Sequence, residues 1–293
     1  MQEIIDLTKF DTADDWIKKE NGYMSISAVE DMLHTPFDKE ACAKKCEEKG
    51  KEIPNYKYAG MTAKQIMEAW EAKAEESRRY GKMLDEYAEA KFTGTQDDID
   101  LYLLDHDIDS DKRLKGHIMA MDAFYDRLMK SGDIEFVTRE KDVWLQMPND
   151  RAIRGRYDAL FYNKALQKYI VIDWKSNECV ETTPTKWTSK LLGPMSSYWD
   201  LSWWKYTLQT LFYKMALIKG NYLPTTNPDD VTTLIVNLPS IPYNDEHSVA
   251  PKNSLYCMFK PAFEYNEELL TKTFDYALKK KKILDRKQNK ENN

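Results

Sequence analysis

The chain has 293 residues, of which 42% are hydrophobic and 31% are charged, a balance that fits one or two soluble domains with a buried core. This composition excludes disorder over the whole length. No apolar run approaches the roughly 18 residues that a membrane helix needs, and residues 1–20 mix acidic and basic side chains where a signal peptide would be apolar. We therefore expect a soluble, cytoplasmic protein with no membrane partner.

The net charge of −6 is unevenly distributed along the sequence. Residues 1–150 carry 22 Lys and Arg against 34 Asp and Glu, whereas residues 151–293 carry 21 against 15 and are therefore basic. The basic half could face a polyanion such as a nucleic acid. Five of the eight tryptophans fall within residues 174–204 of this half, where they could stack on bases, although core packing is the more common role.

Helical patterns dominate the first half of the chain. Apolar residues recur at helical spacing in three segments, residues 25–33, 62–91 and 112–129. The pattern changes near Gly132, after which β-branched and aromatic residues with partial alternation, or a continuous apolar run, predict three strands at residues 134–146, 152–162 and 168–175. A polar, proline-containing loop over residues 176–197 follows the third strand.

The remaining elements are predicted as a helix at residues 201–219 ended by Gly220, a strand at 231–238, an edge strand at 255–260, a helix at 265–286, and a frayed polar tail from 279 to 293. There is no internal repeat. We therefore expect one α/β domain over residues 1–293, with a mainly helical N-terminal part (1–131), a sheet core (132–262) and a C-terminal helix with its tail (263–293).

Three polar residues are placed where strand packing does not explain them. Asp173 and Lys175 end an apolar strand, and strand alternation puts both side chains on one face. Asp158 lies on the preceding strand. Because a buried carboxylate must be paired or bound to a metal, two carboxylates with a nearby ammonium suggest a Mg²⁺ site. A plain ion pair between Asp173 and Lys175 is the alternative, and the spacing alone favours it.

The order of these residues resembles the PD-(D/E)XK nuclease superfamily, in its RecB-like and lambda-exonuclease-like branch. There, a strand with G-x-x-D leads through a hairpin to a strand that ends in D/E-x-K, and a later helix carries Q-x-x-x-Y. The matching residues are Gly155, Asp158, Asp173, Lys175, Gln209 and Tyr213. The similarity covers about residues 81–238, and it implies a restriction-endonuclease-like core, in which a central mixed β-sheet is flanked by helices, with a helical N-terminal elaboration.

Two upstream segments depart from the family pattern. The family helix G-T-x-x-H-x-x-x-E keeps its spacing at residues 81–89, but Asp85 stands where His is common. Glu89 could supply a further metal ligand, and a solvated acidic helix face explains it equally well. Residues 25–36 resemble the S-x-S-x-L…C-P segment of RecB-like nucleases, with Thr35 in place of the Cys. The scattered cysteines therefore predict no iron-sulfur cluster.

The resemblance implies roles for the matching residues. Asp158, Asp173 and the carbonyl of Trp174 would bind Mg²⁺, for which Mn²⁺ could substitute, and Lys175 would orient or deprotonate the attacking water. Gln209 and Tyr213 on the later helix would bind a backbone phosphate or position Lys175. A substrate-contacting loop element is expected at Lys186, Trp187 and Lys190.

The hypothesis that follows is a Mg²⁺-dependent DNA nuclease, more specifically an exonuclease, acting in replication, recombination or repair. Phages encode such enzymes, and a phage-encoded one would act in the host cytoplasm. Its partners would be single- or double-stranded DNA and a separate recombinase, single-strand-binding or helicase chain. The alternative is a nucleic-acid-binding or assembly protein that keeps the fold without turnover. Endonuclease action, cleavage polarity and an RNA substrate stay open.

Overall fold

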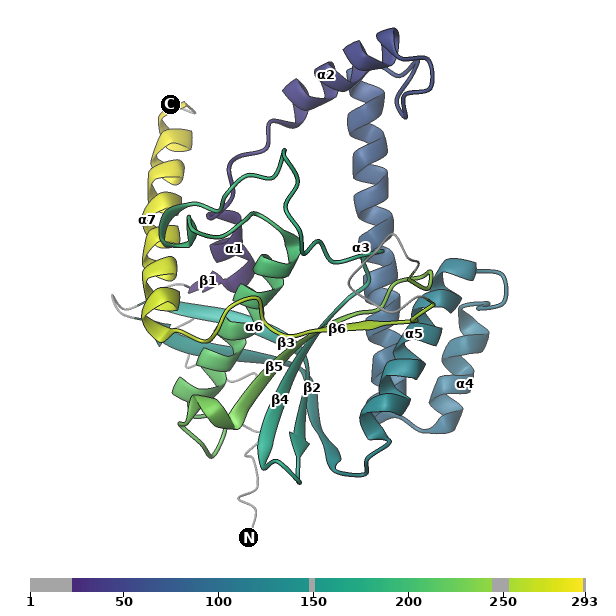
Figure 1. The fold of residues 1–293 in the computed structure, drawn as a ribbon, viewed down its shortest axis with the longest axis vertical. Coiled ribbons are helices and arrows are strands. Elements are labelled where there is room, and N and C mark those ends of the chain that lie inside the picture. Colours follow the sequence, from purple (N-terminus) through teal and green to yellow (C-terminus); the bar gives the residue numbers. More distant parts are fainter. Residues whose placement is uncertain (1–22, 148–150, 244–252, 292–293) are drawn as a thin grey trace. The chain divides into compact units, whose positions relative to one another are not determined.

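The computed structural model describes residues 23–147, 151–243 and 253–291 (Figure 1). The chain divides into two compact units. Unit 1 comprises Met1–His34 and Met119–Asn293, and unit 2 comprises Thr35–Ile118. The expectation of one nuclease domain over the whole chain stays a prediction, and the expectation about residues 1–20 lies outside the described residues.

A mixed β-sheet forms the centre of unit 1. Its strands are β1 (Tyr23–Ser25), β2 (Ile134–Met147), β3 (Arg151–Asn163), β4 (Lys168–Lys175), β5 (Val231–Asn237) and β6 (Cys257–Phe259). The strand order is β1-β3-β4-β5-β6, and β2 pairs with β3. The pairs β1–β3 and β4–β5 are parallel and the others are antiparallel. The protein is therefore an α/β protein whose mixed sheet is flanked by helices.

Strand β3 has different neighbours along its two edges. β2 pairs with it along its length, whereas the other edge is shared by β1, which pairs with Ala152–Arg154, and β4, which pairs with Ala159–Asn163. Residues 155–158 lie between these two paired stretches. The G-x-x-D segment therefore occupies the part of β3 where one edge has no strand neighbour among the described residues.

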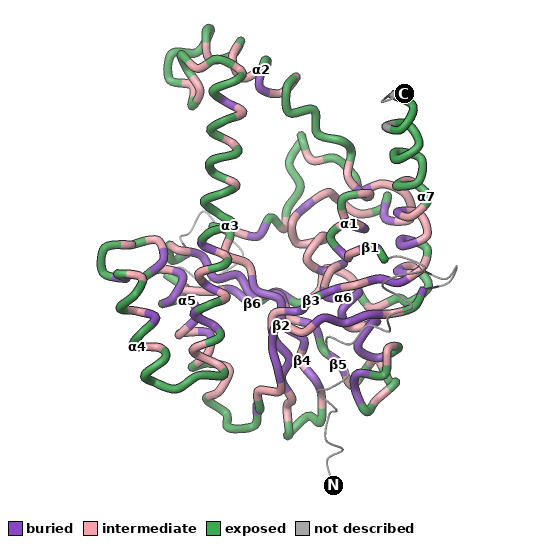
Figure 2. The backbone as a smooth tube through the Cα atoms, turned by 180° about the vertical axis from the view of Figure 1, so that it is seen from behind, coloured by how far each residue is buried: buried purple, intermediate pink, exposed green. Residues whose placement is uncertain are grey.

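Three helices of unit 1 share one apolar core with the sheet. They are α1 (Ile26–Asp31), α6 (Ser202–Lys219) and α7 (Glu267–Glu291), and each contributes buried side chains, such as Val29, Phe212 and Phe274. α1 begins at Ser25, whose Oγ accepts a hydrogen bond from the backbone N–H of Ala28 at 3.1 Å. α6 is buried at nearly every position of its second half (Figure 2).

Unit 2 is helical. It contains α2 (Lys39–Glu52), α3 (Ala63–Thr93), α4 (Gln96–Asp105) and the first part of α5 (Lys112–Met129), which ends in unit 1. α3 begins with a capping box between Thr62 and Gln65. Its second half packs Tyr87 against Tyr102 of α4, with ring centroids 5.5 Å apart, whereas its first half is largely exposed (Figure 2).

The predicted helices and strands of the sequence are confirmed, with shifts of a few residues at their ends. The predicted frayed tail is wrong, because α7 continues as a helix to Glu291; the last two residues lie outside the described part. The sequence interpretation missed β1, α2, α4 and two short 3-10 helices, Gly193–Met195 and Pro228–Asp230. β1 has three residues, and α2 buries only Ala43 among its described side chains, so neither shows a periodic apolar pattern.

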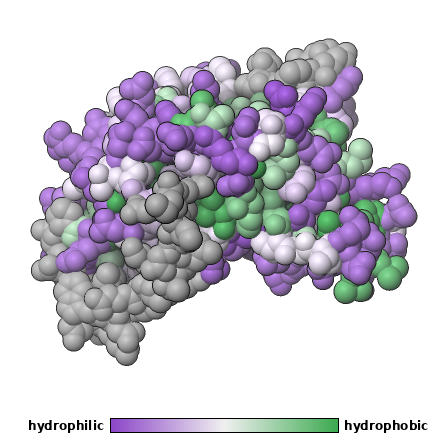
Figure 3. Space-filling view, turned by 90° about the horizontal axis from the view of Figure 1, so that it is seen from below, coloured by the Kyte–Doolittle hydropathy of each residue, from purple (hydrophilic) through white to green (hydrophobic). Residues whose placement is uncertain are grey.

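Among the described residues on the face shown in Figure 3, hydrophilic side chains are the most frequent, and apolar side chains show between them. Large apolar side chains that are exposed occur at scattered positions in both units, such as Leu104, Leu166 and Trp187. Within the described ranges, no helix combines the length and the apolar character needed to cross a membrane.

Candidate functional site

Asp158 connects β3 to the end of β4. The two strands stop pairing at Ile172, and beyond that point the backbone N–H of Trp174 donates a hydrogen bond to Oδ2 of Asp158 at 2.6 Å. The carboxylate therefore takes the place of a backbone acceptor at this part of the sheet. This contact holds Asp158 against the Asp173–Trp174 segment, where the sequence predicted a site.

Asp173 and Lys175 form an ion pair between a buried carboxylate and a partly buried ammonium, with Oδ2 of Asp173 2.7 Å from Nζ of Lys175. Asp173 is 1% exposed, and burial raises its pKa above the ordinary value although Lys175 opposes this. Burial also acts to lower the pKa of Lys175, but the carboxylates of Asp173 and Asp158 outweigh it and raise that pKa. Lys175 is therefore a cation at neutral pH.

Glu30 on α1 is a third carboxyl group of this site, and the sequence interpretation did not single it out. Its Oε1 is buried and accepts no hydrogen bond from the described residues. Burial raises its pKa to about 8, with Lys175 acting to lower it and Asp173 to raise it. Glu30 lies four residues after Ile26, so the two side chains share one face of α1. An acidic residue on the apolar face of a helix is the sequence signal that could have identified Glu30.

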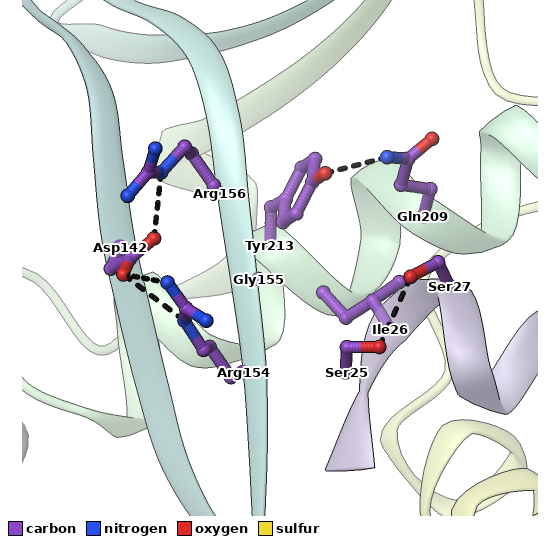
Figure 4. Close-up of a pocket in the computed structure, with 9 residues that line it drawn as sticks. All are labelled: Ser25, Ile26, Ser27, Asp142, Arg154, Gly155, Arg156, Gln209 and Tyr213. Carbon is purple, nitrogen blue, oxygen red and sulfur yellow. Dashed lines mark hydrogen bonds and ion pairs between the residues drawn. The ribbon is translucent and has the colours of Figure 1, made fainter.

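Gln209 and Tyr213 lie on one face of α6, as the sequence predicted. Nε2 of Gln209 donates a hydrogen bond to the hydroxyl of Tyr213 at 2.6 Å (Figure 4). Burial raises the pKa of Tyr213 well above the ordinary value, and the negative charges of Asp173 and Asp158 add to this. Tyr213 therefore stays a neutral hydroxyl within electrostatic reach of the carboxylates.

Gly155 explains how α6 comes this close to β3. A Cβ atom at this position would lie 2.4 Å from Cδ1 of Ile26 and 2.5 Å from Cε1 of Tyr213. Such distances are shorter than carbon atoms tolerate, so only glycine fits here without a shift of α1 or α6. The glycine of the G-x-x-D motif thus has a packing function in this chain.

A pocket of about 340 Å³ adjoins Tyr213. It is lined by Ser25, Ile26, Ser27, Asp142, Arg154, Gly155, Arg156, Gln209 and Tyr213 (Figure 4). Both guanidinium groups converge on Asp142: Nε of Arg154 is 3.0 Å from its Oδ2, and Nε of Arg156 is 2.8 Å from its Oδ1. In Figure 4 both guanidinium groups turn toward Asp142 and away from Gln209 and Tyr213, because neighbouring residues of a strand project to opposite faces and Gly155 faces Tyr213. The sequence interpretation did not identify either arginine.

Some predicted site residues lie elsewhere. Glu89 belongs to unit 2, where its carboxylate accepts a hydrogen bond from Thr93 at 3.0 Å, so its role as a metal ligand stays a prediction. In the loop between β4 and α6, Trp187 is 83% exposed, with Nζ of Lys186 5.0 Å from its ring centroid. Lys190 lies over the ring of Trp199 at 3.6 Å, so its ammonium is held within the loop.

The donor atoms of the site fit a hard divalent cation. No arrangement of three or more His, Cys, Asp or Glu side chains that could hold a metal occurs among the described residues. However, Asp158 and Asp173 supply carboxylate oxygens, and the buried Oδ1 of Asp173 and Oε1 of Glu30 accept no hydrogen bond from the described residues. Such oxygens are what Mg²⁺ or Mn²⁺ binds. The predicted ligand role of the Trp174 carbonyl stays a prediction.

The cysteines are divided between the units. Cys42 and Cys46 lie on α2 of unit 2, whereas Cys179 and Cys257 lie in unit 1. The hydroxyl of Tyr56 lies 3.4 Å from Sγ of Cys46. The prediction that the protein binds no iron-sulfur cluster stays a prediction.

Comparisons with known proteins add little to this description. No family model and no curated protein matches the sequence. Among solved structures, the chain aligns with one titled "Crystal structure of SSO0001", at 11% sequence identity and a TM-score of 0.30, over 68% of this chain and 73% of that chain. A TM-score this low supports no conclusion about fold or function, so the functional interpretation depends on the geometry of the site.

Proposed function

We propose that this protein is a metal-dependent nuclease that hydrolyses phosphodiester bonds in DNA, built on a restriction-endonuclease-like core of the PD-(D/E)XK type. The observation that carries the proposal is the group formed by Asp158 within β3 and by Asp173 and Lys175 at the end of β4, in which Asp173 is buried and the other two are partly buried. Asp173 is 1% exposed, and burying a carboxylate costs free energy unless a cation or a metal compensates its charge. Glu30 and the Gln209–Tyr213 pair support the same interpretation.

The residues of the site suit phosphodiester hydrolysis. Lys175 is a partly buried cation that can stabilise negative charge on the scissile phosphate and orient the attacking water. Because its pKa is about 8, Glu30 can hold or take up a proton near neutral pH. Mg²⁺ held by Asp158 and Asp173 would supply further stabilisation of charge at the phosphate.

The pocket beside Tyr213 suits a phosphate of the substrate strand. Arginine guanidinium groups bind phosphate oxygens, and Arg154 and Arg156 both line this pocket, although both guanidinium groups are paired with Asp142. Gln209 and the hydroxyl groups of Ser25 and Ser27 add uncharged donors. We place a backbone phosphate in this pocket, and we assign base and backbone contacts outside it to the loop that carries Lys186, Trp187 and Lys190.

We place this activity in DNA replication, recombination or repair, as in phage-type nucleases. The substrate is single- or double-stranded DNA, and exonuclease action is the form that the family resemblance favours. We further propose a helicase, a single-strand-binding protein or a recombinase as its partner.

The test compares end-labelled linear double-stranded, linear single-stranded and circular DNA in Mg²⁺, Mn²⁺ and EDTA. Wild-type protein is expected to degrade linear DNA only with metal, and Asp173→Asn is expected to lower the rate by at least about 100-fold. Asp133→Asn, at an exposed position before β2, is the matched control and should retain activity.

Each other outcome has a definite meaning. Nicking of circular DNA would assign the protein to the endonucleases. Equal activity of wild type and Asp173→Asn would contradict the proposed site. Metal-independent binding of DNA without any product, by folded protein, would favour the alternative of a binding protein without turnover.

A further inference from the structure

A buried amide lies next to the strand that carries the candidate catalytic lysine. Asn237 is the last residue of β5, stands opposite Lys175 in the parallel β4–β5 pair, and is fully buried. Its Nδ2 donates hydrogen bonds to the carbonyl oxygens of Lys175 at 2.9 Å and Asn177 at 2.8 Å. Its Oδ1 accepts a hydrogen bond from the hydroxyl of Tyr243, which is 2% exposed. The amide is therefore satisfied as both donor and acceptor.

The same network reaches the side chain of Lys175. Nδ2 of Asn177 donates a hydrogen bond to the hydroxyl of Tyr206 at 2.9 Å. The ring of Tyr206 in turn lies under the ammonium of Lys175, with Nζ 4.8 Å from the ring centroid. Lys175 is thus fixed at its carbonyl by Asn237 and at its ammonium by Asp173 and Tyr206.

Ordinary sheet pairing does not require this amide. The backbone N–H of Leu238 already donates to the carbonyl of Lys175 at 2.8 Å, so the β4–β5 ladder is complete without a side chain. Burying an amide costs free energy that an apolar residue would not cost, unless every polar atom is paired. The additional effect of Asn237 is to fix the backbone of residues 175–177, where the chain leaves the sheet and enters the loop before α6.

We propose that Asn237 and Tyr243 are positioning residues for Lys175. Tyr243 orients the amide of Asn237, the amide fixes the backbone from Lys175 to Asn177, and Asn177 fixes the ring on which the ammonium of Lys175 rests. The catalytic meaning of this network rests on the proposed nuclease function, whereas the ordering of residues 175–177 does not.

The kinetic test uses linear DNA with Mg²⁺. Asn237→Leu keeps the side-chain size and removes all three hydrogen bonds, so kcat is expected to fall about 10- to 100-fold, with KM within about twofold. Tyr243→Phe removes one hydroxyl, and a smaller fall of about 3- to 10-fold is expected. Val236→Ala is the matched control: it is buried on the same strand but faces the opposite side, so it should lower stability and leave kcat unchanged within about twofold.

A second measurement does not depend on activity. Backbone ¹⁵N relaxation of the wild type is expected to give order parameters of about 0.85 for residues 175–177, as in rigid backbone. In Asn237→Leu these order parameters should fall below about 0.6. Val236→Ala should leave them unchanged. If Asn237→Leu does not fold, Tyr243→Phe carries both measurements, with smaller changes in the same direction.

The outcomes separate this proposal from the proposed function. A wild type that cleaves no DNA overturns the nuclease function, and the order parameters then decide the positioning of residues 175–177. Unchanged order parameters in both network variants overturn the positioning proposal. So does an unchanged kcat in an active protein, or a loss of kcat in Val236→Ala that equals the loss in Asn237→Leu.

Discussion

Gly155 is the residue at which α1 and α6 approach β3 too closely for any side chain. Gly155→Ala is expected to lower the free energy of unfolding by about 1–3 kcal/mol, because the added methyl would overlap Ile26 and the buried ring of Tyr213. The terminal carbon of Ile26 can rotate away, but the ring of Tyr213 is enclosed. Urea denaturation of wild type and variant measures the difference.

Tyr213→Leu provides the control for this explanation. The smaller side chain leaves room for the methyl group, so Gly155→Ala should cost less free energy in the Tyr213→Leu background than in the wild type. An equal cost in both backgrounds would show that the close approach of the ring is not what requires glycine.

Glu30 makes stability depend on pH. In the unfolded chain it loses its proton near the ordinary value of 4.5, whereas in the folded protein its pKa is about 8. Between these values the folded state binds more protons, so the free energy of unfolding falls as pH rises from 4.5 to 8. The neighbours that modulate this pKa are Lys175 and Lys205, which lower it, and Asp173 and Asp31, which raise it.

Glu30→Gln removes this titration. In EDTA, the variant is expected to be more stable than the wild type by about 1–3 kcal/mol near pH 9, and to approach it near pH 4. The measurement is urea denaturation at several pH values. If wild type and Glu30→Gln lose stability in parallel as pH rises, the buried carboxyl group is not the cause.

At the scale of elements, the end of α1 is held by a residue of α7. Nζ of Lys280 donates hydrogen bonds to the carbonyl oxygens of Met32 at 2.8 Å and His34 at 3.2 Å, and burial lowers its pKa. Lys280→Met should lower the free energy of unfolding by about 1–3 kcal/mol, because these carbonyls lose their donor. Thermal denaturation measures this effect.

The adjacent residue supplies a matched control. Lys281 is exposed, so Lys281→Met should change the free energy of unfolding by less than about 0.5 kcal/mol. Equal effects of the two substitutions would mean that the general charge of α7, and not the contact with α1, accounts for the loss.

Helices and strands with regularly spaced apolar residues could be predicted from the sequence. Contacts between elements that are distant in the sequence could not. Spacing within one element placed Asp173 beside Lys175 and Gln209 beside Tyr213, because residues two apart on a strand or four apart on a helix share a face. No such spacing relates α1 to β4, so the third carboxyl group at Glu30 was missed. The same holds for contacts of β5 with the end of β4, which are about 60 residues apart in sequence.

At the scale of the whole molecule, the basic half of the sequence ends in an exposed cationic segment. The exposed basic residues after Lys280 include Lys281, Lys282, Arg286 and Lys287. Lys280 itself contacts the end of α1, the helix that carries Glu30. The cationic end of α7 and the candidate site therefore belong to the same unit and are connected through α1. Such a segment suits the backbone of a DNA substrate, although a solvated helix end has the same composition.

DNA binding distinguishes these two explanations. When four cations of α7 are replaced by Gln, fluorescence anisotropy in EDTA is expected to show at least about 10-fold weaker binding of duplex DNA near 0.1 M salt. The slope of the logarithm of the binding constant against the logarithm of the salt concentration is expected to become shallower by up to about 3. These substitutions are at Lys281, Lys282, Arg286 and Lys287. The matched control replaces four exposed lysines of unit 2, Lys45, Lys49, Lys57 and Lys73, and changes the net charge by the same amount. An equal loss of affinity in both variants would attribute the effect to net charge alone, because only a contact at α7 weakens binding selectively when α7 is changed.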